Sequence, residues 1–432
     1  MNPRKRLLWA GAAAICAVGA LGLGIAAWVV YEPEIPKIPR PAASSFSADQ
    51  IKRGEQLATV GDCIVCHTKD NGPPFAGSRA LPTPFGTLYS NNITPDEETG
   101  IGNWSAEAFR RAVKEGIGRD GSHLYPALPY EHFIKVNDDD LDAIYAFLMS
   151  REPVSEVAPE NQLLPGLGIR QSLAGWKLLF LHGGHSEEDT TKSAEWNRGK
   201  YLVDGLAHCG ACHTPRNLLG AEKWGNEFGG GIAEGWNAPP LNASNPSAAR
   251  WNVDALTEYL TTGTSAAHST AAGPMGPVSE GLLRLNSKDV HAIATYIDDI
   301  MHAGRPDRPQ LQNVDVDNSK TSSMQSATAD LFQGACAGCH EPKSPMALRG
   351  RPLLSATSDL NADDPRNSIQ AVLQGIQAPV GSNAPYMPPF ADNLTDSQVS
   401  ALLGYARFRF TTKAPWPDLE KTVREIRKEN QQ

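Results

Sequence analysis

Three copies of one short motif, Cys-x-x-Cys-His, constrain this chain of 432 residues more than any other feature. Two thiols at this spacing can bond to the two vinyl groups of one porphyrin, while the adjacent histidine reaches the iron. The pattern is typical of haem c attachment. We therefore predict three covalent haems c, attached through Cys63, Cys66, Cys209, Cys212, Cys336 and Cys339, with His67, His213 and His340 as proximal iron ligands.

A lone Cys-x-x-Cys pair also occurs in thioredoxin-like redox sites and in half of a zinc site. Both alternatives are disfavoured, because the motif occurs three times and each copy continues into histidine. The seventh cysteine, Cys16, lies in an apolar N-terminal stretch, where we interpret it as a helix-packing residue. The net charge of −9 argues against nucleic acid as a partner, because a phosphate backbone selects basic surfaces.

The N-terminus predicts a membrane anchor. A basic cluster at residues 4–6 precedes 24 uncharged residues, Leu7 to Val30. A helix of that length spans roughly 36 Å, enough to cross a hydrocarbon core of about 30 Å. A cleaved signal peptide is the alternative, but its apolar region is usually shorter, about 7–15 residues. We expect residues 1–31 to anchor the chain in the inner membrane, with everything after them in the periplasm.

The sequence around each motif repeats as well. In every repeat a middle helix is expected to end on glycine, and twelve residues later stands Leu128, Met275 or Met387. A helix with the haem motif, a middle helix, a ligand loop and a C-terminal helix describe a small domain similar to a class I cytochrome c. The predicted fold class is all-α, with three tandem cytochrome c domains at residues 46–152, 193–304 and 326–412.

Met275 and Met387 are the predicted distal ligands of haems 2 and 3, although a lone methionine is often core filler. A thioether opposite histidine raises the haem potential. Leu128 cannot bind iron, so haem 1 is either open or bound by another residue. His132 is favoured slightly over His123, and both could also be ordinary loop histidines. Met149 is a weaker candidate, because its register matches polar residues and suggests an outward-facing position.

Three further segments carry expectations. Residues 153–175 and 305–325 are rich in turn-forming residues and are predicted linkers. The apolar segment 170–185 could contact the membrane surface or another subunit. A linker helix packed on the first two domains is the favoured interpretation. The charged tail, residues 413–432, is expected to form a solvated helix.

From about residue 45 to residue 410 the chain resembles the three-haem cytochrome subunits of membrane-bound bacterial dehydrogenases. The matching stretches are residues 84–96, 124–130, 208–215 and 235–239. The resemblance implies that electrons arrive from a separate catalytic subunit and leave to ubiquinone or a terminal oxidase.

Two branches of that family are similar to this chain. In the quinoprotein alcohol dehydrogenase and flavoprotein gluconate, sorbitol or fructose dehydrogenase branch, methionine usually stands where this chain has Leu128. In the branch partnered with molybdopterin hydroxylases of aldehydes or N-heterocycles, that position is typically not methionine. This second branch also resembles the chain at residues 72–77, at 131–133, and at His268 ahead of 273–275. We favour the molybdopterin branch, whose catalytic subunit is accompanied by an iron–sulfur or other small subunit.

A different class of function is a haem enzyme, such as a peroxidase that uses an open haem 1. The absence of a separate catalytic domain in the sequence disfavours it. A cytochrome subunit of a terminal oxidase is likewise disfavoured, because the chain has one expected membrane helix and three haem domains.

Overall fold

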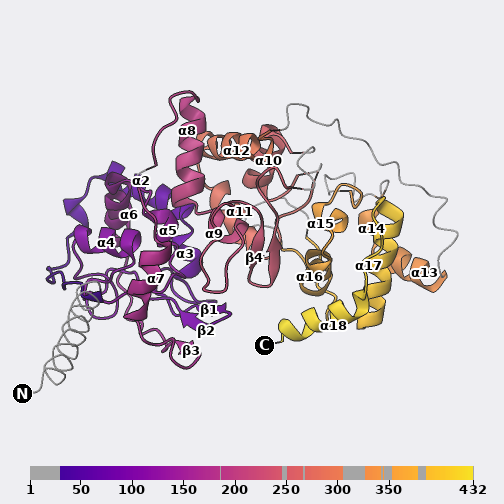
Figure 1. Cartoon of the computed structure of the whole chain (residues 1–432), viewed down its shortest axis with the longest axis horizontal. Coiled ribbons are helices and arrows are strands. Elements are labelled where there is room, and N and C mark those ends of the chain that lie inside the picture. The colour runs from indigo at the N-terminus through magenta and orange to yellow at the C-terminus, as the bar shows by residue number, and fades with distance from the viewer. Residues whose placement is uncertain are drawn as a thin grey trace, which may run out of the picture. The chain divides into compact units, whose positions relative to one another are not determined.

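The computed structural model describes residues 30–184, 186–245, 251–265, 268–304, 326–341, 344, 353–377 and 386–431 (Figure 1). The chain divides into two compact units. Unit 1 comprises residues 1–58 and 66–185, and unit 2 comprises residues 59–65 and 186–432. The haem motifs that begin at Cys209 and Cys336 therefore both lie in unit 2.

The elements up to residue 184 are mainly helices with one small sheet. In chain order they are η1 (Ala43–Ser45), α2 (Ala48–Val60), α3 (Cys63–Cys66), β1 (Ala80–Thr83), β2 (Gly86–Tyr89), α4 (Ala106–Glu115), α5 (Tyr130–Phe133), α6 (Asp138–Met149), β3 (Gln162–Leu163) and α7 (Ser172–Phe180). The strands form an antiparallel sheet in the order β1-β2-β3, with Ala80 opposite Tyr89 and Gly86 opposite Leu163.

Local sequence fixes the ends of the middle and C-terminal helices of unit 1. Ser105 caps α4 by accepting a hydrogen bond from the Ala108 amide, and Asn137 caps α6 in the same way. Gly116 ends α4 with a φ of 62°, a left-handed conformation that favours glycine. The middle helix thus ends on the glycine that the repeat pattern predicted.

Unit 2 continues the same plan. Its elements are α8 (Ala194–Tyr201), the π-helical turn η2 (Leu202–Leu206), α9 (Gly210–His213), β4 (Gly231–Ala233), β5 (Trp236–Ala238), α10 (Val253–Thr262), α11 (Met275–Leu283), α12 (Ser287–Met301), α13 (Ser326–Ala335), α14 (Ala337–His340), α15 (Ser358–Asn361), α16 (Arg366–Gln374), α17 (Asp396–Phe410) and α18 (Leu419–Glu429). Strands β4 and β5 form an antiparallel hairpin with Ile232 opposite Asn237.

Two glycines allow the first and last helices of the first two repeats to pack closely. A Cβ atom at Gly54 of α2 would overlap the carbonyl oxygen of Ala143 in α6. A Cβ atom at Gly199 of α8 would overlap the carbonyl oxygen of Ala292 in α12. The same helix pairs are joined by ion pairs at equivalent positions, Arg53–Asp140 and Arg198–Asp289. The repeated Arg-Gly pair therefore places the haem-motif helix against the C-terminal helix.

The prediction of an all-α fold was correct only in outline. Most of the regular secondary structure in the described residues is helical, and they also contain the three-stranded sheet and the β4–β5 hairpin. Within these described ranges, no helix has the length and apolar character needed to cross a membrane. The expected anchor at residues 1–31 lies almost entirely outside the described residues, of which Val30 is the first.

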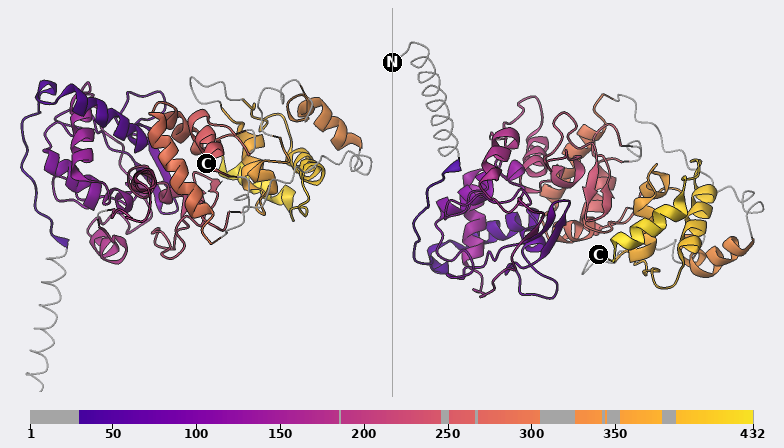
Figure 2. Two further views of the ribbon diagram at one scale, coloured as in Figure 1. Left: turned by 90° about the horizontal axis from the view of Figure 1, so that it is seen from above. Right: turned by 60° about the horizontal axis from the view of Figure 1, so that its bottom comes forward.

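The expectation of a solvated C-terminal tail was wrong. Helix α18 packs against α17, and both are yellow in Figures 1 and 2. Val423 and Ile426 of α18 are buried with Trp416 in the hydrophobic core of the third repeat. The charges of α18 lie on one helical face, and the opposite apolar face is covered. The core of the third repeat thus extends beyond its predicted end at residue 412.

The outward-facing position expected for Met149 was also wrong. Met149 is 0% exposed at the end of α6, and the polar residues at its register, Asp298 and Arg407, are buried too. The Arg407 guanidinium donates hydrogen bonds to the carbonyl oxygens of Leu360 and Ala362. The polarity of Arg407 therefore reflects buried hydrogen bonding rather than contact with water.

Helix α7 occupies the segment for which a linker helix was favoured. Trp176 packs edge-on against Tyr130 of unit 1, with ring centroids 6.0 Å apart. Lys177 is buried, while its neighbours Leu178 and Leu179 are more than half exposed. The helix is therefore an integral part of the first repeat's packing.

Candidate haem sites

Each haem motif forms a short helical turn, α3, α9 or α14, which brings its two cysteines and its histidine together. All six motif cysteines are free of disulfides. Burial raises the pKa of Cys209 to about 12 and that of Cys336 to about 11, with the partner cysteine of each motif as the next cause. A redox-active thiol requires a lowered pKa. These thiols therefore do not fit a thioredoxin-like site, but they are free to form thioethers.

Two of the predicted proximal histidines, His67 and His213, are held in the tautomer that iron binding requires. Nδ1 of His67 lies 2.6 Å from the carbonyl oxygen of Asn91, and Nδ1 of His213 lies 2.6 Å from that of Pro239. Because a carbonyl can only accept, Nδ1 carries the proton in both rings and Nε2 keeps its lone pair. This is the arrangement by which an outer partner orients a metal-binding histidine.

Electrostatics favours the same neutral form of these rings. Burial lowers the pKa of both His67 and His213, an effect that outweighs the opposing hydrogen bond to the backbone carbonyl. A neutral imidazole is the form that binds a metal. The residues of both motifs therefore fit haem c on two independent grounds, the cysteines that form no disulfide and the fixed tautomer.

The backbone around the motifs repeats with the same geometry. The amide of Gly77 donates to the carbonyl of His67 at 2.7 Å, and the amide of Gly230 donates to the carbonyl of His213 at 2.8 Å. The residues that accept from the histidine rings, Asn91 and Pro239, were not recognised from the sequence as part of the sites. Both lie in stretches that carried the family resemblance, but a backbone acceptor leaves no signature in residue type.

Each predicted ligand loop follows the C-terminal end of a middle helix. An isolated β-bridge follows each closing glycine, pairing Ile117 with His123, Thr264 with Thr270 and Ile376 with Met387. Met387 exchanges two backbone hydrogen bonds with Ile376, both 2.9 Å. Met275 begins α11, and Leu128 lies in a turn in which its amide donates to the Tyr125 carbonyl.

His123 uses both ring nitrogens within unit 1. Nε2 lies 3.0 Å from the carbonyl oxygen of Val30 and therefore donates to it. Nδ1 then accepts from Nζ of Lys177 at 3.1 Å. The ring is buried, so it has no nitrogen left for iron in this arrangement. The other candidate, His132, lies buried in α5.

Lys177 is a residue near the first site that the sequence did not reveal. Its Nζ donates to the carbonyl of Gly116 at 2.6 Å and lies 5.4 Å from the ring centroid of Tyr130. Burial lowers its pKa to about 8, and the charges of Glu32 and Glu115 partly oppose that shift. Lys177 thus ties α7 to the C-terminal end of the middle helix and to the loop that carries Leu128.

In the second repeat, two buried rings support the loop before Met275. His268 stacks on Trp251 with ring centroids 3.4 Å apart and an angle of 4°. Gly273 has a φ of 51°, and a Cβ atom there would meet the indole of Trp236. The stacked pair and the tightly packed glycine together place the start of α11.

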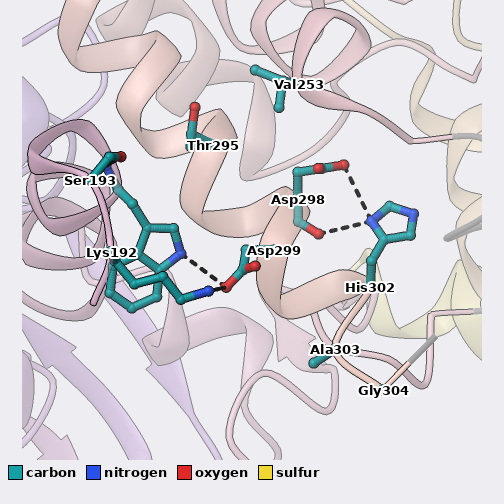
Figure 3. Close-up of a pocket in the computed structure, with 10 residues that line it drawn as sticks. Lys192, Ser193, Val253, Thr295, Asp298, Asp299, His302, Ala303 and Gly304 are labelled. Carbon is teal, nitrogen blue, oxygen red and sulfur yellow. Dashed lines mark hydrogen bonds and ion pairs between the residues drawn. The ribbon is translucent and has the colours of Figure 1, made fainter. Parts of the chain in front are cut away.

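A hollow of about 630 Å³ in unit 2 contains none of the predicted haem ligands. Asp299 accepts hydrogen bonds from the Trp196 indole at 3.0 Å and from Lys192 at 2.9 Å. Figure 3 shows Lys192 reaching toward Asp299 and Asp298 facing His302. The hollow lies between the beginning of α8 and the end of α12. Because its walls carry acidic and basic groups that pair with each other, we assign it no part in haem binding.

Known proteins with similar sequences identify the family. A cytochrome c family model matches residues 51–152, and a model described as cytochrome c oxidase, cbb3-type, subunit III, matches residues 324–405. The chain is 35% identical over 402 residues to the fructose dehydrogenase cytochrome subunit of Gluconobacter japonicus, which covers 87% of this chain and 82% of that protein. It is 33% identical over 410 residues to the cytochrome c subunit of alcohol dehydrogenase (quinone) from Gluconobacter oxydans, covering 89% and 84%.

The chain belongs to the multi-haem cytochrome c subunits of bacterial membrane dehydrogenases. It is an electron-transfer subunit of a dehydrogenase complex and carries covalent haem c, which confirms the predicted family and general function.

A third relative is a nicotinate dehydrogenase subunit of Pseudomonas putida. It is 45% identical to this chain over 436 residues, which are 99% of this chain and 36% of that protein. The chain thus spans about a third of the length of this relative.

Proposed function

We propose that this cytochrome subunit accepts electrons from a molybdopterin-dependent dehydrogenase of an N-heterocycle or an aldehyde. The observation that carries the proposal is the 45% identity to the nicotinate dehydrogenase subunit over nearly the whole chain. The fructose and alcohol dehydrogenase relatives are 35% and 33% identical. Leu128 supports the same branch, because the quinoprotein and flavoprotein branch usually has methionine there.

Three haems are proposed to carry the electrons, one in each repeat. Haem c supplies reversible one-electron chemistry when bound. His67 and His213 present Nε2 to the iron because the carbonyls of Asn91 and Pro239 hold the proton on Nδ1. His340 is assigned the same role in the third repeat, and Met275 and Met387 are the proposed distal ligands of haems 2 and 3.

For haem 1 we propose His132 as the distal ligand. Both ring nitrogens of His123 are already hydrogen-bonded, which weakens the case for that residue. Met149 is buried in α6, so it remains the second candidate. A second imidazole in place of a thioether stabilises ferric iron and lowers the potential, so haem 1 would be the lowest of the three.

The subunit is proposed to be held at the inner membrane by residues 1–31, with its haem domains in the periplasm and ubiquinone as acceptor. The basic cluster and apolar run at the N-terminus support this topology. Attachment of haem c on the extracytoplasmic side agrees with it. An iron–sulfur or other small subunit would accompany the catalytic subunit.

The decisive experiment is purification of the complex from native membranes, followed by identification of its partners and substrate. Nicotinate or an aldehyde should reduce the haems of the complex, as seen in the visible absorption spectrum, while ethanol, fructose and gluconate should not. A pyridine haemochrome assay should give three haems per chain. Co-purification of a quinoprotein or flavoprotein subunit would overturn the molybdopterin assignment, and reduction by ethanol or fructose would have the same consequence.

A further inference from the structure

The second and third repeats meet within unit 2 through the β4–β5 hairpin and helix α16. The Asn367 side chain pairs with the backbone of Asn237 in both directions. Its Oδ1 accepts from the Asn237 amide at 2.8 Å, and its Nδ2 donates to the Asn237 carbonyl at 2.8 Å. The Asn367 side chain therefore pairs with both the amide and the carbonyl of Asn237 in the neighbouring repeat. A neighbouring strand would pair with the same two backbone groups.

The hairpin is tied directly to the proximal side of haem 2. Pro239, two residues after Asn237, is the acceptor for the Nδ1 proton of His213. At the other strand, a Cβ atom at Gly231 would overlap the carbonyl oxygen of Cys212. The hairpin therefore cannot move without displacing either the imidazole or the backbone of the haem motif.

Helix α16 is tied equally closely to the ligand loop of haem 3. The helix ends at Gly375, and the next residue, Ile376, exchanges two hydrogen bonds with Met387. The amides of Phe390 and Ala391 then donate to carbonyls of α16. The position of α16 thus sets the position of the proposed distal ligand.

The contact has a second anchoring point at the tip of the hairpin. The carbonyl of Gly235 accepts from Arg366 and from Gln370, each at 3.2 Å. The C-terminal helix holds both donors in place: Glu429 pairs with Arg366 at 2.6 Å, and Asn430 exchanges hydrogen bonds with Gln370. Arg366 and Gln370, which both contact the second repeat, are thus held in position by residues of the third repeat.

We propose that Asn367 is a positioning residue that docks the third repeat onto the His213 side of the second, and thereby keeps haems 2 and 3 close enough for rapid electron exchange. This inference rests on the proposed assignment of His213 and Met387 as haem ligands. The step it supports is the transfer of one electron from one reduced iron to the other oxidised iron. No proton or atom is transferred, so the rate depends on distance and orientation, which the docking contact controls.

The test compares three variants of the full, haem-loaded chain with the wild type. Asn367→Ala removes both hydrogen bonds, whereas Asn367→Asp keeps the acceptor for the Asn237 amide. Asn237→Ala is the matched control, because the hydrogen bonds to Asn367 use the backbone of Asn237 and survive the substitution. Pulsed EPR measures the distance distribution between the ferric haems, and flash reduction measures the rate of electron redistribution among them.

Loss of two hydrogen bonds should lower the ratio of docked to undocked molecules about 30-fold. In Asn367→Ala we therefore expect a broader distance distribution and slower redistribution, with unchanged haem content and potentials. Asn367→Asp should be at least as disruptive as Asn367→Ala, because its second carboxylate oxygen faces the Asn237 carbonyl and the Asp359 carboxylate. Asn237→Ala should match the wild type. An unchanged distance and rate in Asn367→Ala would overturn the proposal, as would an equal effect of Asn237→Ala.

Haem content and ligation separate this inference from the proposed function. If the wild type contains fewer than three haems or lacks methionine ligation at haem 3, the proposed function fails before docking is tested. If Asn367→Ala loses haem 3, Asn367→Asp becomes the deciding variant. In that case wild-type exchange rates in a haem-complete Asn367→Asp protein, with no broadening of the distance, would reject the docking role.

Discussion

Replacing Lys177 by methionine tests how the first repeat tolerates a buried ammonium group. The side chain is 8% exposed, and burial lowers its pKa from 10.5 to about 8. A shift of that size corresponds to roughly 3 kcal/mol between the two protonation states. Between pH 8 and pH 10.5 the unfolded lysine binds a proton that the folded one has lost, so the wild type should gain stability as the pH rises.

Neutral lysine still has two N–H groups, so it can still donate to the Gly116 carbonyl and to Nδ1 of His123. When Lys177 loses its proton, the folded protein therefore becomes more stable relative to the unfolded chain without losing either hydrogen bond. Lys177→Met has no proton to lose, and it leaves Nδ1 of His123 without its donor, at a cost of about 1–3 kcal/mol. The Gly116 carbonyl keeps the Leu124 amide as a donor. The variant should be less stable than the wild type at high pH, and the difference should shrink by roughly 3 kcal/mol on going down to pH 7.

Hydrogen exchange followed by mass spectrometry gives the local opening free energy of α7 and of the end of α4, after correction for the intrinsic exchange rate. Wild type and Lys177→Met should be compared at several pH values between 7 and 10.5. Stability curves that run parallel over this range would refute the reasoning, because they would show that Lys177 keeps an ordinary pKa when folded. A wild type that loses stability relative to the variant as the pH rises would refute it as well.

Three further predictions concern the haem ligands, the helix packing and the anchor. His132→Ala should change the EPR spectrum of haem 1, whereas His123→Ala should leave its ligation intact; the opposite result would exchange their roles. In thermal unfolding, Gly199→Ala should destabilise the second repeat by a few kcal/mol, because its methyl group overlaps a backbone carbonyl. The control, Gly404→Ala, should be neutral or stabilising, because no atom lies within 4 Å of the added methyl group. Replacing residues 1–29 by a cleavable secretion signal should give a soluble, haem-loaded protein. If mass analysis shows that the mature native protein already lacks residues 1–29, the segment is a signal peptide instead.

Sequence alone predicted the cofactor, the helical character and the general function of this protein. The attachment of haem c depends on a spacing within five consecutive residues, and such a pattern survives any tertiary arrangement. Helix ends were also predictable, because a glycine such as Gly116 acts on its own turn. The resemblance to dehydrogenase cytochrome subunits rested on the same kind of local stretches, and the relatives confirm it.

Only the tertiary structure showed what surrounds each histidine. The acceptors for His67 and His213 are 24 and 26 residues away in sequence, and both are backbone carbonyls. Lys177 reaches the Gly116 carbonyl across 61 residues. Every residue has a carbonyl, so residue type cannot indicate which one will accept.

Burial at the end of the last helices was likewise decided by the fold. Met149 was expected to face outward because it aligns with polar residues such as Arg407, yet the Arg407 guanidinium is buried among carbonyls. Helix α18 was expected to be solvated because of its many charges, yet Val423 and Ile426 are buried in a core formed by distant elements. A charged side chain is costly to bury without partners, and only the fold determines whether the partners are present.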